Sequence, residues 1–307
     1  MSYDGLVLLA FGGPHKAEDI RPFLRNVLAG RPVPPGRIEE VAHHYEQLGG
    51  SSPITKYTEA QAQALSEELA RRGIELPVRV GMRHWSPWLK DALAAFRDEG
   101  KQRLLGLVMA AQETEASVAR YSQAVEVART ELGDGVPTVD YVRGWGGTEG
   151  FIDANAAQIG ATLESLSADA RARVKLIFSA HSIPSPMAAE SPYVQQLERV
   201  REGVCQRLGV SNSRLVYQSR SGNPRDPWLE PDICDALEEE KAAGTQTVVV
   251  APIGFVCDHV EVLFDLDVEA KEKCDELGLE FHRAPTVGTH PAFIASLADA
   301  VQASFSE

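Results

Sequence analysis

Short apolar runs alternate along this chain with longer stretches in which apolar residues recur at helical spacing. The runs expected to form strands are residues 6–11, 76–82, 103–110, 137–142, 174–180, 214–219, 246–253 and 279–284. Helix-length stretches lie between them, at residues 55–72, 114–132, 150–166, 192–208, 230–243, 258–276 and 291–304. This strand–helix–strand rhythm predicts βαβ units around mostly parallel sheets, and therefore an α/β fold.

The number of strands leaves two architectures open. A chain of 307 residues can form one closed βα-barrel or two open lobes. We favour two Rossmann-like, doubly wound lobes, because strand lengths and connections are uneven and each half has its own strand running into a turn, "LLAFGGP" and "LIFSAHSIP". The glycine-rich stretch at 143–150 predicts a boundary, with lobes at 1–145 and 146–307. Whether the last helix packs back on the first lobe is left open.

Composition excludes several classes of protein. The net charge of −14 argues against a nucleic-acid backbone or an anionic membrane surface as the main partner. The apolar runs are shorter than the roughly 18 residues that span a bilayer, and the N-terminus has no signal-peptide pattern. The four cysteines form no C-x-x-C pair, which indicates reduced thiols rather than a zinc or cluster site. We therefore expect a soluble cytoplasmic protein.

One segment, "PIGFVCDHVEVLFDLDVEA" at 252–270, begins as a buried strand and then fills with acidic residues. Projected on a helix at 100° per residue, four carboxylates share a stripe of about 80° and Asp267 points away. These four are Asp258, Glu261, Asp265 and Glu269. The pattern fits a solvated acidic face, with Asp258 as helix N-cap, or a stripe that holds cations.

A histidine at the end of another expected strand bears on that choice. His181 follows the apolar run 174–180, and the carboxyl ends of parallel strands meet at one edge of a sheet, where ligands of open α/β folds bind. The acidic helix is expected to begin at the same edge. An imidazole facing a row of carboxylates can bind a divalent transition metal and accept protons. The glycines of "FGGP" match neither a dinucleotide nor a Walker motif, so we interpret them as a tight turn.

Five motifs in order along the chain resemble those of ferrochelatases, the enzymes that insert Fe(II) into a porphyrin. They are "LLAFGGP", "HYEQLGGSSPI", "LIFSAHSIP", "YQSRSGNPRDPWLEPD" and "PIGFVCDHVEVLFDLD". The similarity covers almost the whole length and is strongest to the actinobacterial-type enzymes, which are associated with coproporphyrin III. It implies two Rossmann-like lobes with a porphyrin cleft between them.

The resemblance also implies roles for individual residues. His181 and Glu261 match the catalytic pair that handles protons and metal. The implied metal-ligating set is His181, Glu261, Asp265, Glu269 and His84. The implied porphyrin-binding set is Phe11, Arg31, Ser51, Ser52 and Tyr121. Iron is a substrate in this reaction, and no cofactor is required.

The chain departs from the family pattern at several positions. Phe11 stands where Bacillus-type members have a tyrosine, so a tyrosinate ligand is not expected. Glu113, Thr114 and Glu115 replace a Ser/Tyr/His-rich wall that carries a cysteine in iron–sulfur members, so a [2Fe–2S] cluster is not expected. The alternatives are a protoporphyrin IX ferrochelatase, a related cobalt chelatase, or a non-catalytic porphyrin- or haem-binding protein. We expect a monomer whose partners are porphyrin, ferrous iron and, transiently, other haem-pathway enzymes.

Overall fold

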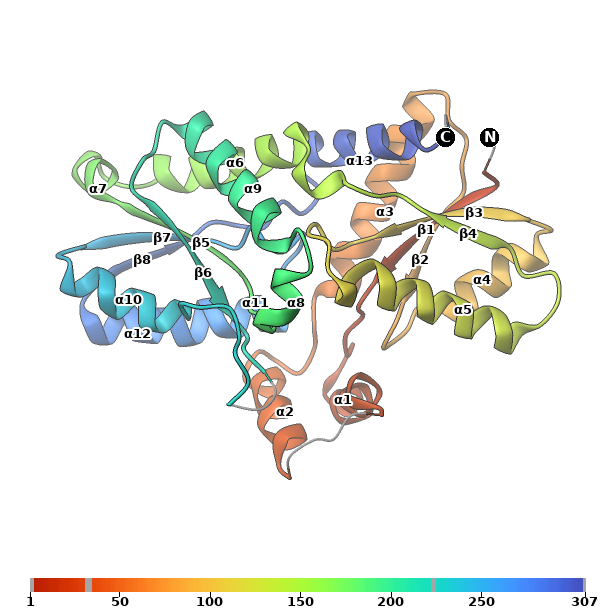
Figure 1. Cartoon of the computed structure of the whole chain (residues 1–307), viewed down its shortest axis with the longest axis horizontal. Coiled ribbons are helices and arrows are strands. Elements are labelled where there is room, and N and C mark those ends of the chain that lie inside the picture. Colours follow the sequence, from red (N-terminus) through yellow and green to blue (C-terminus); the bar gives the residue numbers. More distant parts are fainter. Residues whose placement is uncertain (1–2, 31–34, 222–224, 306–307) are drawn as a thin grey trace. The chain divides into compact units, whose positions relative to one another are not determined.

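A computed structural model describes residues 3–30, 35–221 and 225–305 of the chain. It divides into two compact units, shown in Figure 1. The first consists of residues 1–109, 116–145 and 294–307, and the second of residues 110–115 and 146–293.

The first unit is built on a parallel sheet, which contains four strands in the described residues, in the order β2-β1-β3-β4. The strands are β1 (Gly5–Ala10), β2 (Val78–Met82), β3 (Arg103–Val108) and β4 (Thr138–Tyr141). The helices are η1 (Ala17–Asp19), α1 (Ile20–Leu28), α2 (Arg37–Gln47), α3 (Ile54–Arg71), α4 (Leu89–Asp98), the π-helix η2 (Glu115–Ala119) and α5 (Arg120–Leu132). Every residue of β1 is buried, as a strand in the middle of a parallel sheet must be.

The second unit repeats this topology with the order β6-β5-β7-β8, again four parallel strands within the described residues. Its strands are β5 (Lys175–His181), β6 (Ser213–Gln218), β7 (Thr247–Ala251) and β8 (Glu280–Arg283). Its helices are η3 (Trp145–Gly147), which starts at the boundary, α6 (Glu149–Glu164), α7 (Ala168–Arg173), α8 (Ser185–Ala189), α9 (Tyr193–Leu208), α10 (Ile233–Ala242), α11 (Val260–Val262), the π-helix η4 (Leu263–Ala270) and α12 (Lys271–Leu277). In Figure 1, α6 and α9 lie on one face of this sheet and α10 and α12 on the other.

The predicted α/β fold with two doubly wound parallel sheets is confirmed, and the single closed barrel is excluded. All eight expected strand ranges overlap an observed strand. The last helix, α13 (Pro291–Ala303), starts in the second unit and continues in the first. There Asp299 forms an ion pair of 2.6 Å with Arg72, the residue that follows α3.

Two glycines follow β1 after Phe11, and the structure gives a reason for each. Gly12 has a φ of +90°, a conformation that residues with a side chain rarely adopt. A Cβ on Gly13 would lie 2.6 Å from the Cβ of Ser52, so only glycine permits this close approach. The structure has neither a turn nor a bend at residues 11–14, so the predicted tight turn at "FGGP" is wrong, and the glycines instead permit close packing against Ser52.

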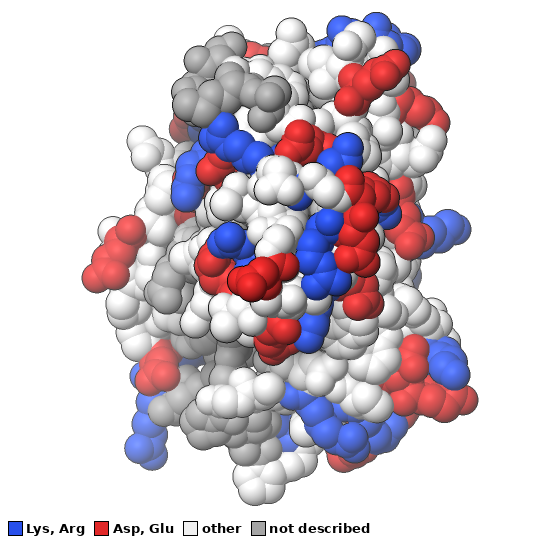
Figure 2. Space-filling model, turned by 90° about the vertical axis from the view of Figure 1, so that its right-hand side faces the viewer, with Lys and Arg blue, Asp and Glu red and all other residues white. Residues whose placement is uncertain are grey.

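Acidic and basic side chains are mixed on the surface. Figure 2 shows Lys and Arg interspersed with Asp and Glu across the face in view, which offers no continuous basic surface among its coloured residues. In the described parts of the chain, no helix combines the length and apolar character needed to cross a membrane.

Candidate active site

The strand order of the second unit predicts a ligand site at one point of its sheet. The chain reverses its direction of winding between β5 and β7, and ligands of doubly wound folds bind at the carboxyl ends of the strands at such a switch point. His181 is the last residue of β5. The segment that follows β7 leads through His259 into the acidic helix. The sheet therefore carries the histidine and the acidic residues to the same edge.

His181 and Glu261 lie beside each other there. Nε2 of His181 is 3.9 Å from Oε2 of Glu261, and the side chains are 33% and 52% exposed. The other ring nitrogen, Nδ1, is in short contact with the carbonyl oxygen of Ser182. Since a carbonyl oxygen can only accept a hydrogen bond, Nδ1 carries the proton in the neutral ring and Nε2 presents its lone pair on the side of Glu261.

The backbone around His181 is held firmly. Its carbonyl oxygen accepts a hydrogen bond of 2.8 Å from the hydroxyl of Tyr193. The next residue, Ser182, donates its backbone N–H to Gln218 on β6 (2.8 Å) and its hydroxyl to the carbonyl of Leu229 (2.9 Å). The position of the imidazole is thus set by three neighbouring elements.

Glu261, Asp265, Asp267 and Glu269 lie on one continuous helix, Val260–Leu277, whose central part is a π-helix. Its i→i+5 hydrogen bonds give a wider turn than the α-helix assumed from the sequence, and such segments often occur at functional sites. Val262, Leu266 and Ala270 belong to the hydrophobic core. The residues just before them, Glu261, Asp265 and Glu269, form the acidic stripe.

Asp265 is the most buried member of this stripe. Its Oδ2 accepts hydrogen bonds from the hydroxyl of Ser219 and from Nε2 of Gln218, the latter at 3.3 Å. Burial raises the pKa of Asp265 to about 7, and the negative charges of Glu261 and Glu269 act in the same direction. Partial burial likewise raises the pKa of Glu269, and the charges of Asp232 and Glu272 act in the same direction.

Asp258 does not belong to the stripe, and the predicted N-cap is wrong. The helix begins at Val260 with His259 in the N-cap position. The carboxylate of Asp258 instead binds Arg283 at the end of β8 (3.1 Å) and the hydroxyl of Thr286 (3.1 Å). Asp267, on the other side of the helix as predicted, pairs with the same arginine at 2.5 Å.

Arg283 therefore divides the acidic residues into two sets. Asp258 and Asp267 share its charge, whereas Glu261, Asp265 and Glu269 form no ion pair with a lysine or arginine among the described residues.

His259 is a candidate site residue to which the sequence analysis assigned no role. Its ring packs edge-on against Phe255, with centroids 5.1 Å apart. Burial lowers the pKa of His259, and the charges of Glu261 and Asp258 oppose that shift. Its position directly before the acidic helix was the one feature of the sequence that could have indicated a role for it.

Several of the remaining predicted residues lie in the first unit. The rings of Phe11 and His84 are 4.5 Å apart, and the backbone N–H of His84 donates to the carbonyl of Phe11 at 2.9 Å. Phe11 is 38% exposed. Ser52 is buried, and its hydroxyl accepts a hydrogen bond of 3.4 Å from the N–H of Ile54 at the start of α3, while the neighbouring Ser51 is half-buried.

Tyr121 is buried on α5, where the guanidinium of Arg83 lies over its ring at 5.8 Å, and burial raises the pKa of its hydroxyl. Arg31 lies outside the described residues. Within the described ranges, no three His, Cys, Asp or Glu side chains come together as a preformed metal site.

The family model described as Ferrochelatase matches residues 3–305. The chain belongs to the ferrochelatase family. A ferrochelatase of Rhodopirellula baltica is 41% identical over 98% of this chain and 86% of its own length. The coproporphyrin III ferrochelatase of Streptomyces coelicolor is 41% identical over 97% of this chain and 84% of its own length. That of Nocardia farcinica is 42% identical over 95% and 86%, respectively.

A solved structure shows the same fold at low identity. The sirohydrochlorin chelatase SirB of Bacillus subtilis, in complex with cobalt, aligns over 98% of this chain and 94% of its own with a TM-score of 0.56 and 10% identity. The substrates of a ferrochelatase are a porphyrin and iron. Because the metal is then cargo, an open acidic stripe next to a histidine suits the chemistry better than a closed ligand cage.

Proposed function

We propose that this ferrochelatase inserts Fe(II) into coproporphyrin III, with His181 as the proton acceptor. The relatives from Streptomyces coelicolor and Nocardia farcinica support the choice of porphyrin through their names. The observation that supports the catalytic pair is the 3.9 Å approach of His181 Nε2 to Glu261 at the switch point of the sheet.

The reaction exchanges two protons for one metal ion. Two pyrrole N–H bonds break, the four ring nitrogens bind Fe(II), and two protons leave. The lone pair on Nε2 of His181 accepts a proton from the ring, and the carboxylate of Glu261 beside it stabilises the imidazolium and passes the proton toward solvent. No redox step occurs, so we propose that the enzyme needs no resident cofactor and no [2Fe–2S] cluster.

Asp265 and Glu269 are the proposed approach for iron. They extend the stripe along the helix from Glu261, and their oxygen atoms suit a divalent ion that must be held weakly and passed on. The raised pKa of Asp265 is consistent with this role, because a bound cation would stabilise the ionised form that burial disfavours. His84 as a further metal ligand stays a prediction.

We propose that the enzyme lies in the cytoplasm; its four cysteines, none of them in a C-x-x-C pair, are compatible with a reducing compartment. That it is a monomer, and that it meets other haem-pathway enzymes only transiently, stay predictions that light scattering and cross-linking would test.

The test is metallation of coproporphyrin III by Fe(II), or Zn(II) as a surrogate, followed through the shift of the Soret band. We expect His181→Ala to lower kcat at least about 100-fold, which is the lower end of general-base catalysis. His282→Ala is a matched control, because His282 is 30% exposed and also has a carboxylate partner, Glu280, at 3.0 Å. It should keep full activity.

Each alternative outcome has a distinct meaning. An unchanged rate in His181→Ala would refute the assignment of the base. Faster turnover of protoporphyrin IX than of coproporphyrin III would refute the substrate, and activity only with Co(II) and a sirohydrochlorin would indicate a cobalt chelatase. Tight porphyrin binding without any metallation would indicate a binding protein.

A further inference from the structure

One polar atom next to the acidic stripe is buried without a partner. Gln218, the last residue of β6, is only 1% exposed, and its side-chain oxygen Oε1 accepts no hydrogen bond from the described residues. Unpaired buried acceptors are rare in folded proteins, because they lose their hydration and gain nothing in return. Such an atom therefore needs an explanation, and an ion that binds during function is one.

The other end of the same amide group faces the stripe. Nε2 of Gln218 donates to Oδ2 of Asp265 at 3.3 Å and to the carbonyl oxygen of Glu261 at 3.5 Å. Gln218 is also the register partner of His181 on the neighbouring strand β5, so both side chains leave the same face of the sheet. Gln218 thus contacts the stripe at two residues and neighbours the strand that carries the proposed base.

The next residue, Ser219, has an unusual backbone conformation. Its φ of +60° is the one positive value of a residue other than glycine in the ranges that the structure describes. This conformation is unfavourable for a residue with a side chain, and proteins often keep it where function requires it. The Ser219 hydroxyl donates to the same Oδ2 of Asp265. Its oxygen keeps lone pairs that it can offer to a cation.

We infer that Gln218 is a ligand of iron on the path along the acidic stripe, through an amide that turns over when the ion arrives. This inference rests on the proposed function and deepens it. Before iron arrives, the NH2 group holds the carboxylate of Asp265. When Fe(II) binds that carboxylate, rotation about the last side-chain bond replaces the NH2 group with Oε1. Oε1 gives up no hydrogen bond to a described residue in this rotation.

The resulting ligand set combines one carboxylate with two neutral oxygens, from Asp265, Gln218 and Ser219. Carboxylate, carbonyl and water oxygens suit ions that are held weakly, whereas imidazole suits iron better. An ion bound to these three oxygens can therefore move on to His181, which supplies a ring nitrogen on the neighbouring strand. The set is thus a transfer point and not a closed cage.

The experiment measures metal binding by wild type, Gln218→Met and Gln218→Glu in the absence of porphyrin. Mn(II), followed by electron paramagnetic resonance, is the air-stable probe for Fe(II). Gln218→Met removes the oxygen and should raise the Kd for Mn(II) about tenfold. Gln218→Glu keeps an oxygen and loses the N–H groups, and should bind Mn(II) at least as tightly as wild type. If Gln218 only positioned Asp265 through its N–H groups, Gln218→Glu would be the worse variant, because two carboxylates repel each other.

Steady-state metallation gives a second readout. Gln218→Met should raise the KM for Fe(II) about tenfold, because the ion loses a ligand on its path. It should change the KM for coproporphyrin III less than about twofold, because Gln218 is buried under the stripe.

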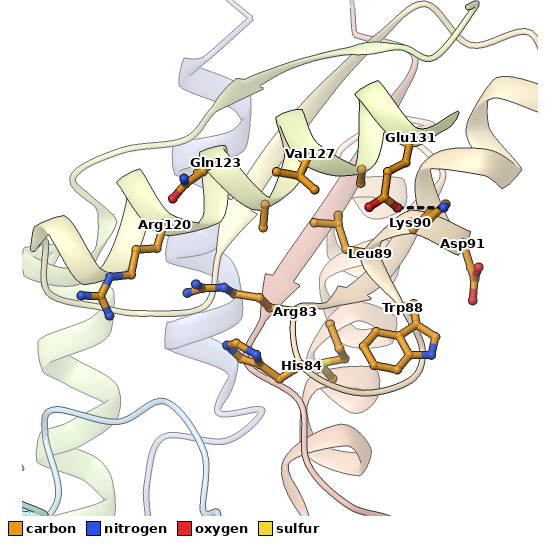
Figure 3. A pocket seen from close by; sticks show the side chains of 13 residues that line it. Arg83, His84, Trp88, Leu89, Lys90, Asp91, Arg120, Gln123, Val127 and Glu131 are labelled. Carbon is orange, nitrogen blue, oxygen red and sulfur yellow. Dashed lines mark hydrogen bonds and ion pairs between the residues drawn. The ribbon is translucent and has the colours of Figure 1, made fainter. Parts of the chain in front are cut away.

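Gln123→Glu is the control for the added negative charge. Figure 3 shows Gln123 on α5, where it lines a pocket of about 540 Å³ in the first unit. This variant has the same net charge as Gln218→Glu, but the new carboxylate lies in the unit without the stripe. It should leave the Kd for Mn(II) within about twofold of wild type.

Gln218→His covers the case in which the buried charge of Gln218→Glu unfolds the protein, which circular dichroism would show. It exchanges the oxygen for a ring nitrogen without adding a carboxylate. It should shift the preference from Mn(II) toward Zn(II) about tenfold relative to wild type, because imidazole suits Zn(II) and oxygen suits Mn(II). A residue that only positioned Asp265 would change the affinity for both metals by the same factor.

An unchanged Kd in Gln218→Met, weaker binding in Gln218→Glu than in Gln218→Met, or equal changes for Mn(II) and Zn(II) in Gln218→His would overturn the role of Gln218 as a ligand. Metal binding that follows these expectations in a protein that metallates no porphyrin would instead overturn the proposed function and leave the metal ligand in place.

Discussion

Replacing Asp265 with asparagine should make the protein more stable at neutral pH and a poorer enzyme. Burial of the Asp265 carboxylate raises its pKa from the ordinary 3.8 to about 7. The negative charges of Glu261 and Glu269 add to this shift. Asparagine has the same shape and can still accept hydrogen bonds from Ser219 and Gln218, but it carries no charge. The substitution therefore removes an electrostatic cost and leaves the packing almost unchanged.

The sign and size of the effect follow from proton linkage. Between pH 4 and 7 the folded protein keeps a proton on Asp265 that the unfolded chain has already lost. The free energy of unfolding therefore falls as the pH rises through this window, by at most about 1.4 kcal/mol per pH unit. The whole shift corresponds to an upper limit of about 4 kcal/mol, which water around the half-buried side chain reduces to about 2 kcal/mol.

The assay is urea unfolding of Asp265→Asn and wild type at a series of pH values from 4 to 8.5. The variant should match wild type near pH 4 and exceed it by about 2 kcal/mol above pH 7. Asp267→Asn is the matched control, because Asp267 lies on the same helix but pairs with Arg283. It should destabilise the protein at pH 7.

The same substitution should also impair the use of iron by the enzyme. At limiting Fe(II), Asp265→Asn should raise KM for the metal about tenfold, since the stripe loses its central oxygen ligand and one negative charge. A stability difference between variant and wild type that stays constant from pH 4 to 8.5 would refute the electrostatic reasoning. An unchanged metal KM would remove Asp265 from the iron path.

Two further substitutions, at Arg283 and Gly146, test the packing and the ion pairs of the second unit. Arg283→Met should lower the free energy of unfolding by about 3 kcal/mol at pH 7 in urea titrations. The reason is that two partly buried carboxylates, Asp258 and Asp267, lose their cation. Lowering the pH toward 4 protonates these carboxylates and should remove most of the difference. Gly146→Ala should cost at least about 2 kcal/mol, because its Cβ would overlap the carbonyl oxygen of Ala111. Gly147→Ala, whose Cβ would meet nothing nearer than 3.5 Å, should fall within about 0.5 kcal/mol of wild type, and equal effects of the two alanines would contradict the steric argument.

The strands and their grouping could be predicted from sequence because parallel strands are buried on both faces and show as continuous apolar runs. A second rule, that the carboxyl ends of parallel strands meet at one edge of a sheet, predicted that His181 and the acidic segment lie together. In the structure, Nε2 of His181 is 3.9 Å from Oε2 of Glu261. The order β6-β5-β7-β8, which makes that edge a switch point, is set by tertiary packing and could not be seen in the chain.

The details of the acidic helix could not be predicted, for two physical reasons. The spacing of its residues is equally compatible with an α-helix, so the π-helical hydrogen bonds of Leu263–Ala270 could not be read from it. The partner of Asp258 is Arg283, which is 25 positions away and reaches it only once β8 has paired with β7. The local rule that an acidic residue before a helix caps it therefore fails here, because a long-range ion pair holds the carboxylate of Asp258.

The two ion pairs of Arg283 leave the negative charge of this segment on one side of the helix. Five carboxylates on one short segment would attract a divalent cation from every side of the helix. Arg283 neutralises Asp258 and Asp267, so the negative charge that remains is concentrated on the side of Glu261, Asp265 and Glu269. We therefore expect a cation that reaches the helix to be drawn to the row of carboxylates that ends beside His181. Arg283 touches none of the proposed catalytic atoms, yet by this reasoning it determines which acidic residues are available to iron.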